Sequence, residues 1–113
     1  MKHHLYLQIA SKLRTTILRG DYAPEQQIPS IRRLAENEKC NPATVQKAMK
    51  VLEEQNLVIS CGTLGYFVIA SEQEIKELRY KESNKLVKIL FEKLGELGFS
   101  EDEIVNLFFR KDA

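Results

Sequence analysis

The sequence of 113 residues has few of the features that mark secreted or membrane proteins. Its two cysteines, Cys40 and Cys61, lack C-x-x-C spacing and are too few for a disulfide scaffold, so we expect free thiols in a reducing cytosol. Whether a disulfide joins them depends on the distance between them, which the sequence does not give. No apolar run approaches about 18 residues, and the first residues lack the long apolar stretch of a signal peptide. We therefore expect a cytoplasmic protein without a membrane span.

Motifs for catalysis and metal binding are also missing. We find no phosphate-binding glycine loop and no pairing of a nucleophile with a base. The strong soft metal ligands are His3, His4, Cys40 and Cys61, and the two adjacent histidines would point to different sides of a helix. A zinc site would need the fold to gather these residues. We therefore expect no enzyme, no cofactor and no bound metal.

Charge is nearly balanced overall but is unevenly placed. The formal net charge is +1, which alone does not indicate a nucleic-acid-binding protein. Residues 1–71 hold 9 Lys and Arg against 6 Asp and Glu, whereas residues 72–113 hold 8 against 10. The first part of the chain can therefore present one basic face.

Apolar spacing predicts three helices in the first half of the chain. The first carries apolar side chains at every fourth position: Leu5, Ile9, Leu13 and Ile17. Ser30 is placed to cap a short second helix, because it follows Pro29 and precedes inward-facing apolar residues. A third helix begins at Asn41, a good N-cap, and Pro42 occupies its first position, where the missing N–H costs nothing.

Two β-rich runs follow the third helix, at residues 57–60 and 66–70. Gly62 and Gly65 bracket the tip between them, which predicts a hairpin. The order helix, short connector, helix, hairpin is that of a winged helix–turn–helix, in which the hairpin is the wing.

A long helical pattern begins after Ser71. Its polar middle is weakly patterned, so we expect a kink or a solvent-exposed stretch there, and a Gly-Glu-Leu-Gly stretch should break the helix. Ser100 and Glu103 form a capping box at the start of a last helix. We predict a mainly α (α+β) fold, with an N-terminal winged helix–turn–helix over residues 1–70 and a two-helix dimerisation region over residues 71–113.

In a winged helix–turn–helix, the third helix enters the DNA major groove and its first residues meet base edges. Free N–H groups at this helix end can also face a phosphate. In this chain the predicted second helix carries arginines that suit forked phosphate contacts. The predicted hairpin tip has a glycine that allows close approach to the sugar-phosphate backbone and a hydroxyl that can bond to it. We predict DNA contacts from small, hydrogen-bonding or basic residues: Arg32, Arg33, Ala43, Thr44, Gln46, Lys47, Gly62 and Thr63.

Each of these features has a simpler reading when it is taken alone. Arg32 and Arg33 could form a solvated helix face. Asn41 and Pro42 could serve only as a cap, and glycines in a hairpin usually serve only the turn. Their order and spacing together favour DNA binding.

Several short motifs lie between residues 6 and 68: Tyr-x-Gln-Ile, Arg-Gly after the first helix, IPSIRRLA, NPATV and NLV. With these motifs the sequence resembles the GntR family of bacterial transcription regulators. The resemblance implies the same fold. It also implies DNA contacts at Ser30, Arg32, Asn41, Ala43, Thr44, Gln46, Lys47, Gly62 and Thr63. The chain departs from the family pattern at Glu25 and Asn56, where the family has glycine, and at Cys61, where the wing often has a basic residue. Base preference stays open.

The part after Ser71 is short, with 42 residues, and resembles the small YtrA-type subgroup, whose two C-terminal helices form a dimer. A lone pair of helices cannot bury the apolar residues of this part well. We predict that they form a dimer interface: Leu86, Ile89, Leu90, Leu94, Leu97, Ile104, Leu107 and Phe108. The alternative is that they pack onto their own winged domain.

These observations together predict a transcription regulator that acts as a homodimeric repressor on double-stranded DNA with two half-sites. A small-molecule effector is left open. The competing hypothesis is a winged-helix module that binds another protein and does not bind DNA.

Overall fold

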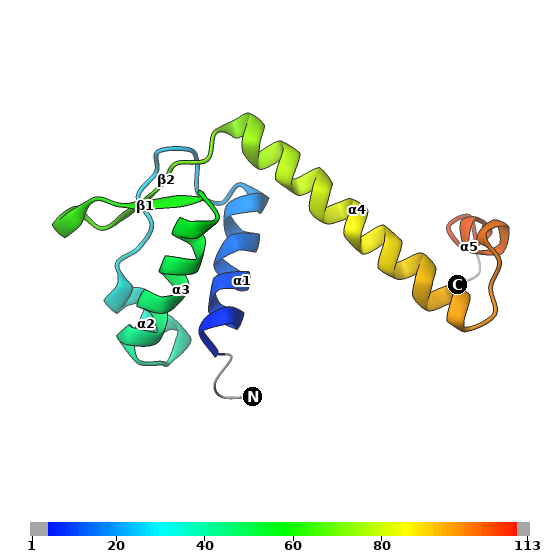
Figure 1. The fold of residues 1–113 in the computed structure, drawn as a ribbon, viewed down its shortest axis with the longest axis horizontal. Coiled ribbons are helices and arrows are strands. Elements are labelled where there is room, and N and C mark those ends of the chain that lie inside the picture. Colours follow the sequence, from blue (N-terminus) through cyan, green and yellow to red (C-terminus); the bar gives the residue numbers. More distant parts are fainter. Residues whose placement is uncertain (1–4, 111–113) are drawn as a thin grey trace. The chain divides into compact units, whose positions relative to one another are not determined.

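The computed structural model describes residues 5–110, which are mainly helical with one two-stranded sheet (Figure 1). Its elements in chain order are α1 (Leu5–Arg19), α2 (Ile31–Glu38), α3 (Pro42–Glu54), β1 (Val58–Ser60), η2 (Gly62–Leu64), β2 (Tyr66–Val68), α4 (Glu72–Glu96) and α5 (Glu101–Leu107). This order confirms the predicted fold class. The described residues form two compact units that divide between Leu78 and Arg79, within α4. Nowhere in the described part is a helix both long and apolar enough for a membrane span.

The core of the first unit lies between α1, α2 and α3 and is closed by the hairpin. Its members come from the three helices, the two strands, the adjoining loops and the start of α4, and they include Ile9, Leu13, Ile17, Leu34, Val45, Met49, Leu52, Val58, Val68 and Ile75. The predicted stripe on α1 is wrong at its first member, because Leu5 lies in the first helical turn, ahead of the core, and is 38% exposed. Ile28, in the loop before α2, is buried although no helical pattern contains it.

The connection between α2 and α3 is a tight turn. Lys39 ends α2 in the left-handed conformation, with φ of 55°. The Cys40 N–H then donates to the Ala35 carbonyl at 3.0 Å, which satisfies one of the last carbonyls of α2. The chain therefore reverses within a few residues, and α3 packs against α2 as a helix–turn–helix requires.

The hairpin pairs β1 and β2 in antiparallel register, with Ile59 opposite Phe67. The paired strands are shorter than the β-rich runs of the sequence, although the Ile69 N–H still donates to the Leu57 carbonyl at 2.9 Å. The tip is a single 3₁₀ turn, closed by a hydrogen bond from the Cys61 N–H to the Gly65 carbonyl at 2.7 Å. The wing is therefore a short, tightly closed hairpin.

The C-terminal helices begin with capping boxes. The predicted box at Ser100 and Glu103 is confirmed, since each side chain bonds the backbone N–H of the other. A second box, formed by Ser71 and Glu74, starts α4 in the same way. The predicted break at Gly-Glu-Leu-Gly falls two residues into that stretch, because α4 includes Gly95 and Glu96 and ends there.

Candidate nucleic-acid interface

The start of α2 presents two arginines. The Ser30 hydroxyl oxygen accepts a hydrogen bond from the Arg33 backbone N–H at 3.1 Å, so Ser30 is the predicted N-cap. Arg32 and Arg33 follow in the first turn, and both are exposed. Among the described residues, no acidic side chain pairs with either guanidinium. Both side chains can therefore approach a phosphate without first breaking an ion pair.

The start of α3 is fixed by Asn41. Its side-chain oxygen accepts from the Ala43 N–H at 2.8 Å, and its carbonyl accepts from the Thr44 N–H at 2.9 Å. The expectation that these N–H groups are free to face a phosphate is therefore wrong, because the cap occupies them and Pro42 has none. Contacts at this helix end must come from side chains. Asn41 and Ala43 are exposed there, and Thr44 is half-buried.

The second turn of α3 carries Gln46 and Lys47, both exposed. The Lys47 Nζ lies 6.0 Å from the centroid of the Tyr6 ring, at the start of α1, within the range of a cation–π interaction. The Lys47 ammonium therefore lies over the ring of Tyr6. The family motif included Tyr6, but local spacing could not reveal a contact between two different helices.

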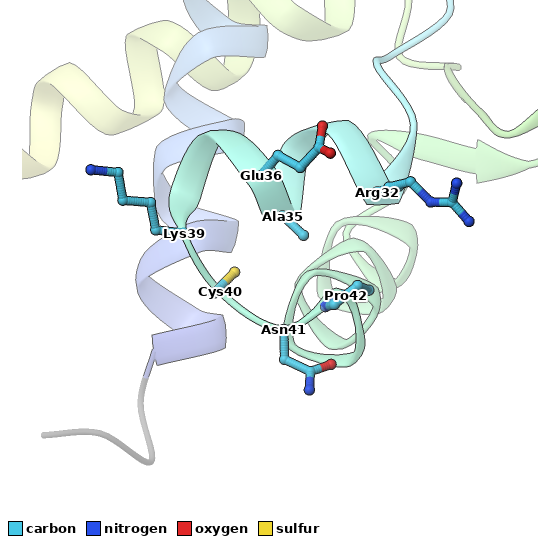
Figure 2. A pocket seen from close by; sticks show the side chains of 7 residues that line it. All are labelled: Arg32, Ala35, Glu36, Lys39, Cys40, Asn41 and Pro42. Atoms are coloured by element: carbon cyan, nitrogen blue, oxygen red, sulfur yellow. The ribbon is translucent and has the colours of Figure 1, made fainter.

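A hollow of about 520 Å³ lies at the turn between α2 and α3. Its lining comes from the end of α2, the connector and the start of α3: Arg32, Ala35, Glu36, Lys39, Cys40, Asn41 and Pro42. Figure 2 shows Arg32 and Lys39 at opposite ends of α2, with Glu36 between them. The half-buried thiol of Cys40 faces this hollow, while the thiol of Cys61 is exposed at the hairpin, and both are free. The hollow thus belongs to the same face as the predicted contacts of α2 and α3.

The hairpin tip presents Gly62 and Thr63, both exposed. Gly62 has a φ of +62°, which suits glycine. The whole hairpin region, residues 57–70, contains no Lys or Arg. Any contact of this tip with DNA would therefore depend on hydrogen bonds and close approach, and not on charge.

Metal ligands do not gather in the described part of the chain. Within residues 5–110, no three His, Cys, Asp or Glu side chains are arranged to hold a metal ion. Two of the four soft ligands considered from the sequence, His3 and His4, lie outside the described residues.

The second unit leaves much of its apolar surface uncovered. Exposed members of the predicted interface are Leu86, Ile89, Leu90, Leu97 and Phe108, while Leu94 and Leu107 are half-buried. Ile104 is only 1% exposed and is already covered by its own chain. Ile104 therefore cannot contact a partner directly, although it packs below residues that can.

The helix–turn–helix of α2 and α3, followed by the β1–β2 hairpin, defines a winged helix–turn–helix DNA-binding domain. Residues 5–68 match the family described as "Bacterial regulatory proteins, gntR family", and the chain belongs to this family of transcription regulators.

Two relatives from Bacillus subtilis (strain 168) are similar to this chain. The HTH-type transcriptional regulator YhcF is 27% identical over 101 residues, which span 89% of this chain and 84% of YhcF. The HTH-type transcriptional repressor YtrA is 33% identical over 64 residues, which span 57% of this chain and 49% of YtrA. The match to YtrA therefore covers only about half of either protein.

Two solved structures are similar to this chain, one over most of its length and one over little more than half. A GntR family transcriptional regulator from Listeria monocytogenes is 25% identical, with a TM-score of 0.85 over 92% of this chain and 91% of that one. The DNA-binding domain of AraR, solved in complex with its operator ORR3, is 30% identical, with a TM-score of 0.55 over 56% of this chain and 76% of that one. The first match extends over both units, and the second covers little more than half of this chain.

Proposed function

We propose that this protein is a cytoplasmic, homodimeric transcriptional repressor of the YtrA type, which binds double-stranded operator DNA at two half-sites. The start of α3 would meet base edges, α2 would contact the phosphate backbone, and the hairpin would act as the wing. The complex of the AraR domain with its operator supports DNA as the partner, and the match to YtrA supports the repressor role.

The observation that carries this proposal is the basic character of the turn and of α3 as far as Lys50, ahead of the acidic Glu53 and Glu54 at the end of the helix. Residues 39–50 contain Lys39, Lys47 and Lys50 and no Asp or Glu. Arg32 and Arg33 stand exposed on the neighbouring helix without an acidic partner. A polyanion such as DNA is the partner that such a face attracts.

The homodimer is proposed from the second unit. Leu86, Leu90 and Leu94 recur at helical spacing on α4, and Leu97 lies in the turn directly after it. All but Leu94 are exposed. A second copy of the same surface would cover them, and two copies would bring two DNA-reading helices to half-sites about 34 Å apart. The ten predicted DNA contacts and the eight interface residues remain predictions at this stage.

The test is a titration of the purified protein against the DNA directly upstream of its own coding sequence, with a scrambled duplex of the same length as reference. We expect tighter binding to the native sequence, and affinity that falls steeply as the salt concentration rises. Equal, weak binding to both duplexes would contradict regulation through this DNA and would favour the protein-binding alternative.

Two variants test whether α2 makes the proposed phosphate contact. Arg32→Ala should weaken binding and reduce the salt slope by about one phosphate contact, because one charge is lost. Lys76→Ala removes the same charge from the start of α4 and should leave the affinity unchanged. If both variants bind like the wild type while the native preference remains, α2 is not the phosphate-contacting helix.

A further inference from the structure

The loop between α1 and α2 runs along the outer edge of β2. The Glu25 N–H donates to the Val68 carbonyl at 2.8 Å, and the Ile28 N–H donates to the Tyr66 carbonyl at 2.9 Å. Between these bonds, Gln27 forms an antiparallel bridge with Phe67. The segment that leads into α2 is therefore attached to the wing as a third, strand-like edge.

The Gln27 side chain extends this attachment to the hairpin tip. Its Nε2 donates a hydrogen bond to the Leu64 carbonyl at 2.6 Å. A carbonyl oxygen only accepts, so the amide nitrogen of Gln27 must be the group that faces it. The same nitrogen lies 3.4 Å from the position that a Cβ on Gly65 would take. Gln27 therefore lies directly against the last residues of the tip.

The other hydrogen bonds of the tip lie within the hairpin, and among the described residues Gln27 is the side chain that bonds the tip from outside it. Leu64 is 67% exposed, and no residue of the hairpin region carries a positive charge that a phosphate could attract. A tip that moves freely must be ordered when it binds, and that ordering weakens affinity. A hydrogen bond that orders the tip in the free protein removes this cost.

We infer that Gln27 is a positioning residue that holds the wing tip at a fixed place relative to the start of α2. Only two residues separate Gln27 from Ser30, which caps α2. One short segment therefore determines the position of the start of the phosphate-contacting helix and the position of the uncharged tip. Gln27 acts through the Leu64 carbonyl and does not itself need to touch DNA. The inference rests on the proposed function, because its effect on affinity requires the wing to meet DNA.

The first test replaces Gln27 by methionine, which keeps a side chain of similar length and removes the donor. Gln27→Met should weaken binding to the upstream DNA about threefold to tenfold, the effect of one lost hydrogen bond. The matched control is Gln26→Met. The Gln26 side chain accepts from the Ala23 N–H at 2.8 Å within the loop, away from the tip, so its loss should leave affinity unchanged. Wild-type affinity in Gln27→Met would overturn the inference.

A variant with a shortened hairpin distinguishes a role of Gln27 in positioning the tip from a general effect of Gln27 on protein stability. In this variant, Asn-Gly replaces residues 61–65 and joins Ser60 to Tyr66, which face each other in the register, through a two-residue turn. The carbonyl that Gln27 holds is then absent, so Gln27→Met should cause no further loss of affinity in this background. A further loss there, or a drop in thermal stability that accounts for the weaker binding, would overturn the positioning role.

Amide hydrogen exchange tests the clamp in the free protein. The N–H groups of Leu64 and Gly65 are hydrogen-bonded within the tip at 3.1 and 3.2 Å, and they should exchange about threefold to tenfold faster in Gln27→Met but not in Gln26→Met. Unchanged exchange would overturn the inference. A wild-type protein that binds no DNA would overturn the proposed function instead, and exchange would still decide whether Gln27 holds the tip.

Discussion

At the scale of single residues, the backbone keeps a conformation that the side chains do not favour. Glu25 and Asn56 have φ of 69° and 62°, in the left-handed region. Both stand where the GntR pattern has glycine, so the chain has changed the side chain and retained the glycine-like backbone. Asn tolerates this region because its short polar side chain can bond locally, whereas Glu has no such relief.

Glu25→Gly should therefore stabilise the protein by about 0.5–1 kcal/mol, since the left-handed strain of about 1–2 kcal/mol is partly offset by the greater flexibility of glycine in the unfolded chain. Asn56→Gly should change stability less. Urea unfolding of both variants measures the two differences in the free energy of unfolding. A larger gain at Asn56 than at Glu25 would contradict this account of strain.

At the scale of elements, helix starts are set by side chains that bond backbone N–H groups. Ser71 and Glu74 form such a pair at the start of α4, with the Glu74 carboxylate 2.8 Å from the Ser71 N–H. The hydrogen bonds from the Ser71 backbone and hydroxyl lower the pKa of Glu74 below its ordinary value of 4.5. The ionised form of Glu74 thus contributes to the stability of the first turn of α4.

The sign of the pH dependence follows from this lowered pKa. The unfolded chain binds a proton more readily at Glu74, so the stabilisation is fully present above about pH 4.5 and is lost as the pH falls through the lower, folded pKa. Glu74→Gln keeps an oxygen acceptor but does not titrate. Unfolding free energies of both proteins, measured between about pH 6 and pH 3, should differ less as the pH falls.

The control for this experiment is Glu77→Gln, which removes the same charge from the next turn of α4, outside the capping box. Its difference from the wild type should vary less with pH. If both variants show the same pH dependence, the carboxylates act through their general charge and the capping bond is not responsible.

Elements with local signals could be predicted from the sequence, and contacts between distant segments could not. The starts of α2 and α3 followed from Ser30, Asn41 and Pro42, because a cap and its helix are neighbours in the chain. The start of α4 has a local signal as well, the S-x-x-E pattern of Ser71 and Glu74.

The remaining features of the candidate site depend on tertiary structure. The edge pairing of Gln27 with Phe67 and the contact of Lys47 with Tyr6 join segments far apart in the chain, so no local periodicity encodes them. The occupied N–H groups at the start of α3 are, in contrast, a local feature. They follow from the cap itself, because the oxygens of Asn41 that cap the helix accept from the N–H groups of Ala43 and Thr44.

At the scale of the whole molecule, the apolar residues of α4 and α5 determine the proposed assembly. Leu90 is 38% exposed and lies in the middle of the leucine series of α4. A charge at this position would be buried without a partner in a dimer but would face water in a monomer. The proposed interface is therefore sensitive to a single substitution.

Leu90→Glu should raise the dimer dissociation constant at least about tenfold, because an unpaired charge loses its hydration on association. Ile69→Glu makes the same chemical change on the exposed edge of the hairpin and should leave the association unchanged. Sedimentation velocity over a range of protein concentrations measures both. A wild-type protein that stays monomeric throughout would contradict the dimer.

The exposed thiol at the hairpin has a practical consequence. Cys61 is exposed beside the wing tip, whereas Cys40, the other cysteine of the chain, is half-buried beside α3. A thiol-reactive fluorophore should therefore attach first at Cys61, because accessibility governs how fast a thiol reacts. The native sequence thus contains its own labelling site, and the emission of that fluorophore would report directly on whether the wing approaches a DNA duplex.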